Sequence, residues 1–494
     1  MSPAPLPGFA GLGSILDAEL GRRLSADELR RELEGRGEHY RRLGVRPGQR
    51  VVLAHGRGWR FFADLFGLWR AGACVIPVDP DGGPAELSAV ADDSQAAWLV
   101  HAGRAGAASA AAALESPDAL AAARSPERPP QPHRTPDEDA LILYTSGTTG
   151  RPKGIVHTFA SVGARLGALR AFVPAGEVGR TPCVLPTQIG HGLIGNSLYP
   201  LLCGGELVLL PPFGRSPRLD LGRVIDEHRI SFLSSVPALW RGVSRLSAPP
   251  ALGTLRRIHC ASAPLDGALW GDILEWSGIR NVLNVYGMTE AASWLSGAPA
   301  APEGLRAGCV GKGWGAEFAV LDEKEPEAGR ALPAGEIGEV WVKTDSLMRG
   351  YHGQEALTRG VLARGWLRTG DLGLREADGS LVLTGRKDDV INRAGLKIQP
   401  GEVEAALRSH PDVADACAFA LPDPVAGQAV AAAVVLREGR PESALAAVAR
   451  WCADRLPAPK RPSRWFRLDR LPRTAQGKLR RKEAAALCGA QPPP

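Results

Sequence analysis

Short apolar runs alternate with amphipathic stretches along the first part of the chain. A capping-box pattern at Ser25–Glu28 predicts the start of an amphipathic helix. The apolar runs Arg50–His55 and Cys74–Val78 predict strands, and the aromatic-rich stretch Trp59–Trp69 between them predicts a buried helix closed by Gly72. Strands that alternate with helices are typical of βαβ units, so this pattern indicates a mostly parallel sheet.

The alternation continues beyond residue 140. The pattern predicts a helix at His157–Phe172 and a short strand at Val184–Pro186. A second βαβ series spans residues 224–261. Further along, Gly335–Lys343 alternates apolar and polar residues, which is typical of a half-buried strand. We therefore predict an α/β protein with a β-rich part near residue 340.

The apolar run Leu141–Tyr144 ends abruptly at a segment of glycines, hydroxyl residues and one lysine. Glycines let the backbone approach a bound group closely, and hydroxyls beside backbone N–H groups suit phosphate oxygens. Surface turns have a similar composition, so the motifs that follow must decide between the two interpretations. The candidate polyphosphate contacts are Thr145, Ser146, Gly147, Thr148, Thr149, Gly150 and Lys153.

The segment is not a Walker A loop. Arg151 and Pro152 separate Gly150 from Lys153, and proline lacks a backbone N–H. The string Tyr144–Lys153 instead resembles the signature loop of the adenylate-forming superfamily, which includes acyl-CoA synthetases, adenylation domains of peptide synthetases and firefly-type luciferases. Further motifs similar to those of the family follow in the family's order, at Ala261–Pro264, Asn284–Glu290, Arg368–Asp371, Arg386–Glu404 and Pro472–Arg480.

The resemblance implies the fold and the division of the chain. It implies an acyl-CoA synthetase-like α/β fold, in which a large N-terminal domain of βαβ-built sheets with a β-rich subdomain joins a small, mobile α+β C-terminal domain. We expect the AMP-binding domain at residues 1–385, the hinge at 386–389 around Asp388, and the lid domain at 390–494.

The resemblance also implies the nucleotide contacts. It gives Glu290 the role of holding Mg²⁺ and Thr289 that of touching the α-phosphate, which fits the preference of Mg²⁺ for one or two carboxylates together with phosphates. It makes Asp371 and Arg386 the ribose contacts. The remaining implied nucleotide-binding residues, around the adenine, are Ala263, Pro264, Tyr286 and Gly287.

Lys478 matches the family's catalytic lysine, through a Pro-x-Thr-x-x-Gly-Lys spacing. A carboxylate that attacks the α-phosphorus of ATP brings two anions together, so a positioned cation suits that step. Taken alone, the lysine would be explained by a solvated basic surface. Gly395 and Lys397 match the loop that, in the family, serves the second half-reaction after the small domain turns about Asp388.

His191 lies where many family members place a histidine or aromatic residue beside the acyl pocket, although a packed core histidine is the alternative interpretation. Amino-acid-activating relatives commonly carry an aspartate in this region, whereas Gln188–Ser197 contains no acid. An aryl, fatty or other non-amino carboxylate is therefore favoured. The expected pocket residues are His191, Val236, Ser262 and Met288.

Composition narrows the partners and the location. The chain has 494 residues and a formal charge of +6, which is too mild to indicate nucleic acid. Its eight cysteines include no Cys-x-x-Cys pair, which indicates free thiols in a reducing compartment. Neither a signal-peptide pattern nor an apolar run of the ~18 residues that span a bilayer is visible, so we expect a cytoplasmic protein without a membrane span.

The resemblance implies an ATP-dependent acid–thiol ligase that uses ATP, Mg²⁺ and CoA and acts on a small carboxylic acid. The alternative acceptor is the phosphopantetheine arm of an acidic carrier protein, which would make the chain a stand-alone adenylation enzyme for acyl or aminoacyl groups. The basic run Lys460–Arg473 suits such a partner, but it suits CoA phosphates equally, and a solvated surface is the commonest explanation of such a run. A luciferase-like oxygenase shares the motifs. A nucleotide-binding module without chemistry would lack Lys478 or Glu290, and a nucleic-acid-binding protein would show steep salt dependence.

Overall fold

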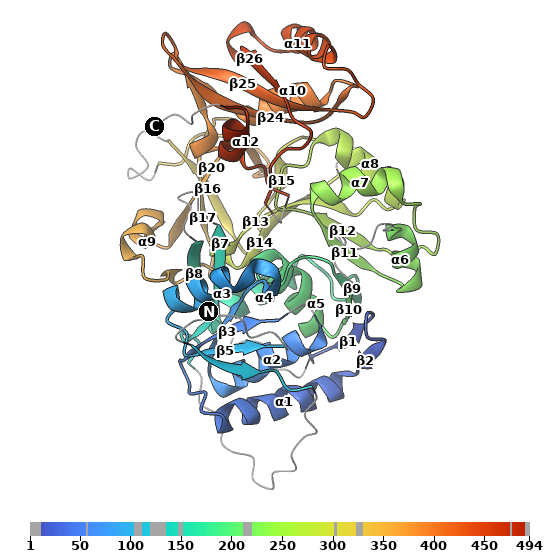
Figure 1. Cartoon of the computed structure of the whole chain (residues 1–494), viewed down its shortest axis with the longest axis vertical. Helices are drawn as coiled ribbons and strands as arrows, with labels where there is room; N and C mark the ends of the chain where they lie inside the picture. Colours follow the sequence, from blue (N-terminus) through green and yellow to red (C-terminus); the bar gives the residue numbers. More distant parts are fainter. Residues whose placement is uncertain are drawn as a thin grey trace.

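The computed structural model of the chain describes residues 11–55, 58–102, 111–118, 135–146, 152–210, 220–300, 304–322, 330–474 and 477–489. Within these residues the strands form five sheets. Figure 1 shows the sheet of the C-terminal part at the top of the molecule, above the four others. No helix in the described ranges has the length and apolar character needed to cross a bilayer.

The first sheet carries the strand that precedes the signature loop. Its order is β18 (Gly350–Tyr351), β8 (Pro152–Thr158), β7 (Asp139–Ser146), β4 (Cys74–Pro77), β3 (Arg50–Ala54), β5 (Trp98–His101) and β6 (Ala112–Glu115). The strands from β7 to β6 pair in parallel, whereas β7, β8 and β18 pair antiparallel. The accompanying helices are α1 (Ala26–Arg42), α2 (Trp59–Ala71), η2 (Pro80–Gly82), α3 (Gly83–Asp93) and α4 (Phe159–Leu169).

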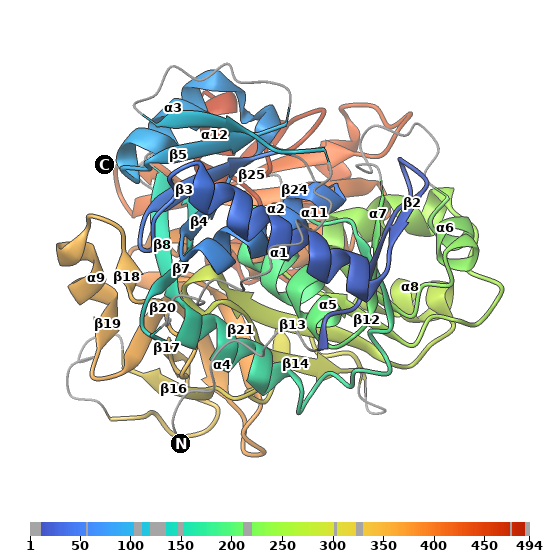
Figure 2. The same cartoon turned by 90° about the horizontal axis from the view of Figure 1, so that it is seen from below.

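Helices α1 and α2 lie side by side below this sheet, and Figure 2 shows them from that side. Helix α1 begins with the predicted capping box, because the Ser25 hydroxyl accepts from the Glu28 N–H and the Glu28 carboxylate accepts from the Ser25 N–H. Helix α2 ends at Gly72, whose φ of +89° is left-handed. All five aromatic side chains of α2 are buried, which confirms the prediction of a core helix.

Two smaller sheets follow. One has the order β2 (Arg22–Leu24), β1 (Ser14–Asp17), β10 (Glu206–Leu209) and β9 (Arg180–Cys183), and the other has the order β11 (Phe232–Ser235), β12 (Arg257–Cys260), β13 (Val282–Met288) and β14 (Ser293–Pro299). Their helices are a π-helix (His191–Leu198), α5 (Tyr199–Leu202), α6 (Leu221–Glu227), α7 (Pro237–Leu246) and α8 (Gly267–Ser277). Because β11, β12 and β13 are parallel, the segments that follow them meet at one edge of their sheet.

The β-rich part is antiparallel. Its sheet consists of β15 (Cys309–Gly311), β21 (Leu381–Arg386), β20 (Trp366–Arg375), β17 (Gly338–Lys343) and β16 (Glu317–Leu321), with β19 (Leu362–Ala363) paired to β20 and α9 (Glu355–Val361) nearby. Strand β17 lies within the predicted range, but its Glu339 is 1% exposed. Arg368 and Lys387 compensate that buried charge, at 2.6 and 3.0 Å.

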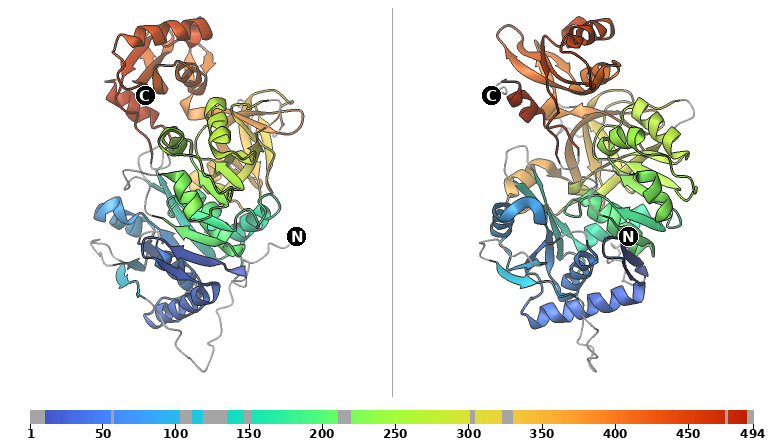
Figure 3. Two further views of the ribbon diagram at one scale, coloured as in Figure 1. Left: turned by 90° about the vertical axis from the view of Figure 1, so that its right-hand side faces the viewer. Right: turned by 45° about the vertical axis from the view of Figure 1, so that its right-hand side comes forward.

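The C-terminal part has its own sheet and apolar core, and Figure 3 shows it projecting from the rest of the molecule. After a short 3₁₀ segment, η7 (Lys387–Asp389), come β22 (Ile391–Arg393), β23 (Leu396–Ile398), α10 (Pro400–Arg408), β24 (Val413–Asp423), β25 (Gly427–Leu436), α11 (Ala444–Arg455), η8 (Ala458–Lys460), β26 (Arg464–Arg467) and α12 (Arg481–Leu487). Sheet and helices together make this part α+β, as the resemblance implied.

Two elements were predicted at the wrong positions along the chain. The helix predicted at His157–Phe172 begins only at Phe159 and ends at Leu169, because residues 152–158 pair with β7 as an antiparallel hairpin. The strand predicted at Val184–Pro186 lies instead at Arg180–Cys183. Pro182 argues against an interior strand, but β9 is an edge strand, and a proline is tolerated there.

Candidate active site

Residues predicted from distant stretches converge around Asp371, which lies on β20 and is 6% exposed. The Tyr286 hydroxyl, from the end of β13, donates to Asp371 Oδ2 at 2.5 Å, and Arg386 Nε lies 2.7 Å from Oδ1. Burial and the adjacent carboxylate raise the pKa of Tyr286 well above its ordinary value, so the phenol stays protonated and donates. The predicted ribose contacts Asp371 and Arg386 are therefore bonded to each other and to Tyr286, one of the predicted adenine contacts.

Glu290 is reached by a residue that the sequence did not single out, Tyr351 of β18. The Tyr351 hydroxyl donates to Glu290 Oε1 at 3.0 Å, and the Lys153 ammonium lies 5.6 Å from the centre of the Tyr351 ring. Burial and the Glu290 charge raise the pKa of Tyr351, which keeps the hydroxyl protonated. One aromatic side chain thus links the lysine after the signature loop to the predicted magnesium ligand.

Thr289 is held through its backbone by His157, at the end of β8. His157 Nε2 lies 2.7 Å from the Thr289 carbonyl oxygen, and Nδ1 lies 3.1 Å from the Ser161 hydroxyl. A carbonyl only accepts, so Nε2 carries the proton and Nδ1 accepts. Burial lowers the pKa of His157 to about 4, so the ring is neutral near pH 7. His157 is fully buried and fixes the turn that carries Thr289.

Lys478 lies close to these groups. Burial among protein atoms lowers its pKa, Arg386 lowers it further, and Asp371 and Glu290 act in the opposite direction. The residue nevertheless remains exposed to water. Its loop contacts the large part of the molecule, since a Cβ added at Gly477 would come within 2.8 Å of Ala238 Cβ in α7. Lys478 is therefore brought to the predicted nucleotide residues by the packing of two distant segments.

His191 begins the π-helix and is fixed between two serine hydroxyls. Nδ1 lies 2.8 Å from Ser262 Oγ, and Nε2 lies 2.7 Å from Ser234 Oγ on β11. Burial, together with the charge of Lys478, lowers the pKa of His191 to about 3. The imidazole is therefore neutral and rigidly oriented beside Lys478. Ser234 is a further residue that the sequence did not indicate.

The remaining residues predicted for the adenine and the acid lie just after β11 and β12 or at the end of β13. Ser262 has a left-handed φ of +70°, and Ala263 and Pro264 come directly after it. Val236 and Met288 are partly buried against apolar clusters. At Gly287 a Cβ would lie 2.2 Å from the Ser293 carbonyl oxygen, so β14 approaches too closely for any side chain there.

The loop implied in the second half-reaction lies elsewhere. Gly395 and Lys397 are exposed on the β22–β23 hairpin, where the Gly395 N–H donates to Asn392 Oδ1 at 3.1 Å. Gly395 has a φ of +87° and open space at its Cβ position. The charges of Glu290 and Asp371 thus act on Lys478, whereas the Gly395–Lys397 hairpin is exposed.

The predicted hinge residue, Asp388, lies in η7, between β21 of the β-rich sheet and β22 of the C-terminal sheet. The preceding residue, Lys387, is anchored to Glu339 at 3.0 Å. Burial alone would raise the pKa of Glu339, but the hydrogen bonds from Arg368 and Lys387 bring it below its ordinary value. The following residue, Asp389, pairs with Arg481 of α12 at 2.6 Å.

Part of the predicted phosphate loop lies outside the described residues: Gly147, Thr148, Thr149, Gly150 and the side chain of Ser146. Thr145 and Lys153, on either side of it, are paired across the β7–β8 hairpin. In the described ranges, no group of three or more His, Cys, Asp or Glu side chains is arranged to hold a metal ion. A cation at Glu290 would therefore need phosphate oxygens as additional ligands.

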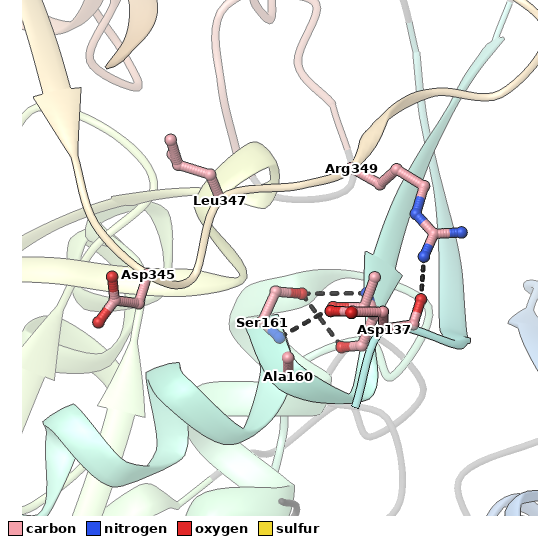
Figure 4. Close-up of a pocket in the computed structure, with 7 residues that line it drawn as sticks. Asp137, Ala160, Ser161, Asp345, Leu347 and Arg349 are labelled. Atoms are coloured by element: carbon pink, nitrogen blue, oxygen red, sulfur yellow. Dashed lines mark hydrogen bonds between the residues drawn. The ribbon is translucent and has the colours of Figure 1, made fainter. Parts of the chain in front are cut away.

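A pocket of about 490 Å³ lies at the start of α4 (Figure 4). Ser161, which contacts the His157 ring, lines it together with Asp345 and Arg349. Figure 4 shows the Asp345 side chain away from Ser161, while Arg349 reaches the segment at Asp137. None of the residues predicted for the active site lines this pocket.

Comparison with known proteins gives two family matches. A model described as AMP-binding enzyme matches residues 14–352, and one described as AMP-binding enzyme C-terminal domain matches residues 402–478. Among relatives, a probable CoA ligase of Humulus lupulus is 36% identical over 354 residues, which are 71% of this chain and 66% of that protein, about two thirds of its length. A sulfoacetate–CoA ligase of Cupriavidus necator is 31% identical over 487 residues, which are 94% of this chain and 93% of the relative.

Among solved structures, ATP-bound MatB from Rhodopseudomonas palustris is similar with a TM-score of 0.85 and 27% identity, over 97% of this chain and 95% of that one. The similarity thus extends over both the large and the C-terminal part. The two family matches cover most of the chain, and they agree with the motifs and with the acyl-CoA synthetase-like α/β fold. The chain therefore belongs to the AMP-binding enzyme family, the adenylate-forming superfamily that its motifs indicated.

Proposed function

We propose that the protein is an ATP-dependent acid–CoA ligase. It joins a carboxylic acid to AMP with release of pyrophosphate, and then transfers the acyl group to the thiol of CoA. The observation that carries the proposal is the convergence of Lys478 with Glu290, Asp371 and Arg386, which come from three separate segments of the chain. The names of the relatives support the reaction class.

In this proposal the first step is governed by electrostatics. The ammonium of Lys478 stabilises the charge that builds up as the carboxylate attacks the α-phosphorus, and no covalent protein nucleophile is needed. Glu290, oriented by Tyr351, is the protein ligand of Mg²⁺. Bound Mg²⁺ neutralises phosphate charge. Asp371, with one oxygen facing Tyr286 and the other facing Arg386, holds the ribose hydroxyls.

The second step requires another arrangement of the two parts. We propose that residues 390–494 turn about Asp388, so that the Gly395–Lys397 hairpin replaces Lys478 beside residues 1–385. The anchoring of Lys387 to Glu339 and of Asp389 to Arg481 supports a pivot between them, because each flanking residue is fixed to a different part. Gly395, exposed and without a side chain, would leave room for pantetheine.

The acid is proposed to lack an α-amino group. The region beside it presents a neutral imidazole and two hydroxyls, and Gln188–Ser197 contains no carboxylate for a substrate ammonium. CoA is the preferred acceptor. A carrier protein remains the second candidate, because Arg464, Arg467 and Arg470 are exposed on the C-terminal part.

A panel of carboxylic acids with MgATP tests the proposal through pyrophosphate release, followed by thioester formation with CoA and, separately, with a phosphopantetheinylated carrier protein. We expect pyrophosphate release with non-amino acids and a faster thioester step with CoA. Turnover only with α-amino acids would contradict the substrate assignment. Thioester formation only on the carrier protein would contradict the acceptor.

A further inference from the structure

The proposed function places the acid next to His191, because two observations put this histidine beside the reacting groups. The charge of Lys478 acts on the imidazole. A Cβ at Gly190, the residue before it, would lie 3.7 Å from Thr289 Cα, so the start of the π-helix touches the turn that carries Thr289. In the proposed function, a carboxylate held between Lys478 and Thr289 would therefore lie next to His191.

Trp294 of β14 packs against His191. The two ring centroids are 5.7 Å apart in an edge-to-face arrangement, and Trp294 is 1% exposed. The indole also contacts His259, at a centroid distance of 4.6 Å, and Phe232, at 6.0 Å, and both are fully buried. These three side chains form a wall, the Trp294 wall, made of Trp294, Phe232 and His259.

The indole also leaves no space against the π-helix. A Cβ added at Gly195 would come within 2.8 Å of Trp294 Cε2 and 2.9 Å of Cζ2, closer than side-chain atoms pack. The glycine is thus matched to the indole, and together they fill the region between the π-helix and β14. A substrate group could not enter this filled region without displacing neighbouring side chains, because protein interiors are closely packed and overpacking is unfavourable.

We infer that the Trp294 wall closes the acyl pocket just beyond His191, so that the acid is short and carries neither a long alkyl chain nor an aromatic ring. This inference rests on the proposed function and specifies its substrate class. Trp294 acts as a specificity-determining residue. Its replacement by alanine should open a cavity, and apolar cavities of about 150 Å³ accept a benzene-sized group.

The test compares kcat/KM for pyrophosphate release with acetate, propionate, sulfoacetate, octanoate, benzoate and ferulate. We expect the unmodified protein to favour the best short acid over ferulate by about 100-fold or more. Trp294→Ala should shift this ratio toward benzoate or ferulate by about 10-fold or more. Because both acids are assayed on one preparation, the ratio does not depend on the fraction of folded protein.

Trp270→Ala is the matched control, since Trp270 is equally buried but lies on α8, where its indole donates to the Val282 carbonyl. Trp270→Ala should lower the stability of the protein without changing the ratio of kcat/KM between the short acid and benzoate or ferulate. If Trp294→Ala does not fold, Trp294→Leu provides the smaller change in the same direction. Efficient turnover of ferulate or octanoate by the unmodified protein would overturn the inference, as would an unchanged ratio in both Trp294 variants. Absence of pyrophosphate release with every acid, in protein that still binds MgATP, would instead overturn the proposed function.

Discussion

At the scale of single residues, the proposed active site depends on side chains that orient the predicted site residues. Tyr351 donates to Glu290, His157 donates to the Thr289 carbonyl, and Ser234 and Ser262 fix the His191 ring. Each uses a buried or partly buried neutral group, whose hydrogen bonds are stronger in a low local dielectric. The predicted chemical groups are thereby held in place before any substrate arrives, which is the condition for electrostatic stabilisation of a transition state.

Tyr351→Phe isolates one of these hydrogen bonds, because the ring that faces Lys153 is retained and only the hydroxyl is lost. Hydrogen bonds to charged groups contribute about 1.5–3 kcal/mol, so we expect acid-dependent pyrophosphate release to fall about 10- to 100-fold. The Mg²⁺ concentration that gives half-maximal rate should rise at the same time. A slower enzyme with an unchanged Mg²⁺ requirement would show that Tyr351 does not act through Glu290.

His157 gives a pH dependence of stability. Its folded pKa of about 4 lies below the unfolded value of 6.5, so the unfolded state binds the proton more readily. His157 does not destabilise the folded state above pH 6.5. As the pH falls from 6.5 toward about 4, the free energy of unfolding decreases progressively, by roughly 3 kcal/mol from this residue. We therefore expect the drop in thermal midpoint between about pH 7.5 and about pH 5 to be smaller in His157→Gln than in the unmodified protein. An identical drop in both would mean that His157 does not remain neutral in the folded state.

At the scale of elements, the loop before Lys478 depends on a close approach to α7. Gly477 has a φ of +77°, and an added Cβ would come within 2.8 Å of Ala238 Cβ. Gly477→Ala should therefore displace the lysine. Misplacement of a reacting group by about 1 Å can cost about 100-fold, which is the loss expected in pyrophosphate release.

Gly489→Ala controls for backbone strain. Gly489 has a similar φ of +70° but open space around its Cβ position. It should leave pyrophosphate release close to that of the unmodified protein, while thioester formation from supplied acyl-AMP should survive in both variants. Equal losses of pyrophosphate release in Gly477→Ala and Gly489→Ala would show that the close approach to Ala238 does not position Lys478.

The sequence predicted most strands and helices of the large part, because apolar runs and capping signals are local. It misplaced β9, since Pro182 is compatible with a strand only at a sheet edge. It also missed the π-helix at His191–Leu198, whose wider hydrogen-bond spacing has no distinct apolar period. In both cases the deciding contacts lie with distant segments.

The residues of the proposed site likewise fall into those that the sequence predicted and those that only distant contacts showed. Motif spacing predicted Lys478, Glu290 and Asp371 as site residues, because their proposed chemistry needs particular residue types at fixed intervals. A single tyrosine or histidine at a strand end carries no such signal, so Tyr351 and His157 became apparent only from hydrogen bonds across 61 and 132 residues. Trp294 likewise reads as an ordinary core residue until its contact with His191 is known.

At the scale of the whole molecule, we propose that the C-terminal part supplies Lys478 to the first half-reaction only. The structure groups Lys478 with Glu290 and Asp371 and leaves the Gly395 hairpin exposed, which is the arrangement expected for adenylation. Lys482, four residues further along on α12, is an exposed lysine and serves as the matched control.

The most direct test measures both half-reactions in Lys478→Ala and Lys482→Ala. We expect Lys478→Ala to lower acid-dependent pyrophosphate release by about 100-fold or more, while thioester formation from supplied acyl-AMP and CoA stays within a few-fold of the unmodified protein. Lys482→Ala should leave both rates nearly unchanged. Equal loss of both half-reactions in a folded Lys478→Ala protein, or retention of pyrophosphate release, would contradict the account.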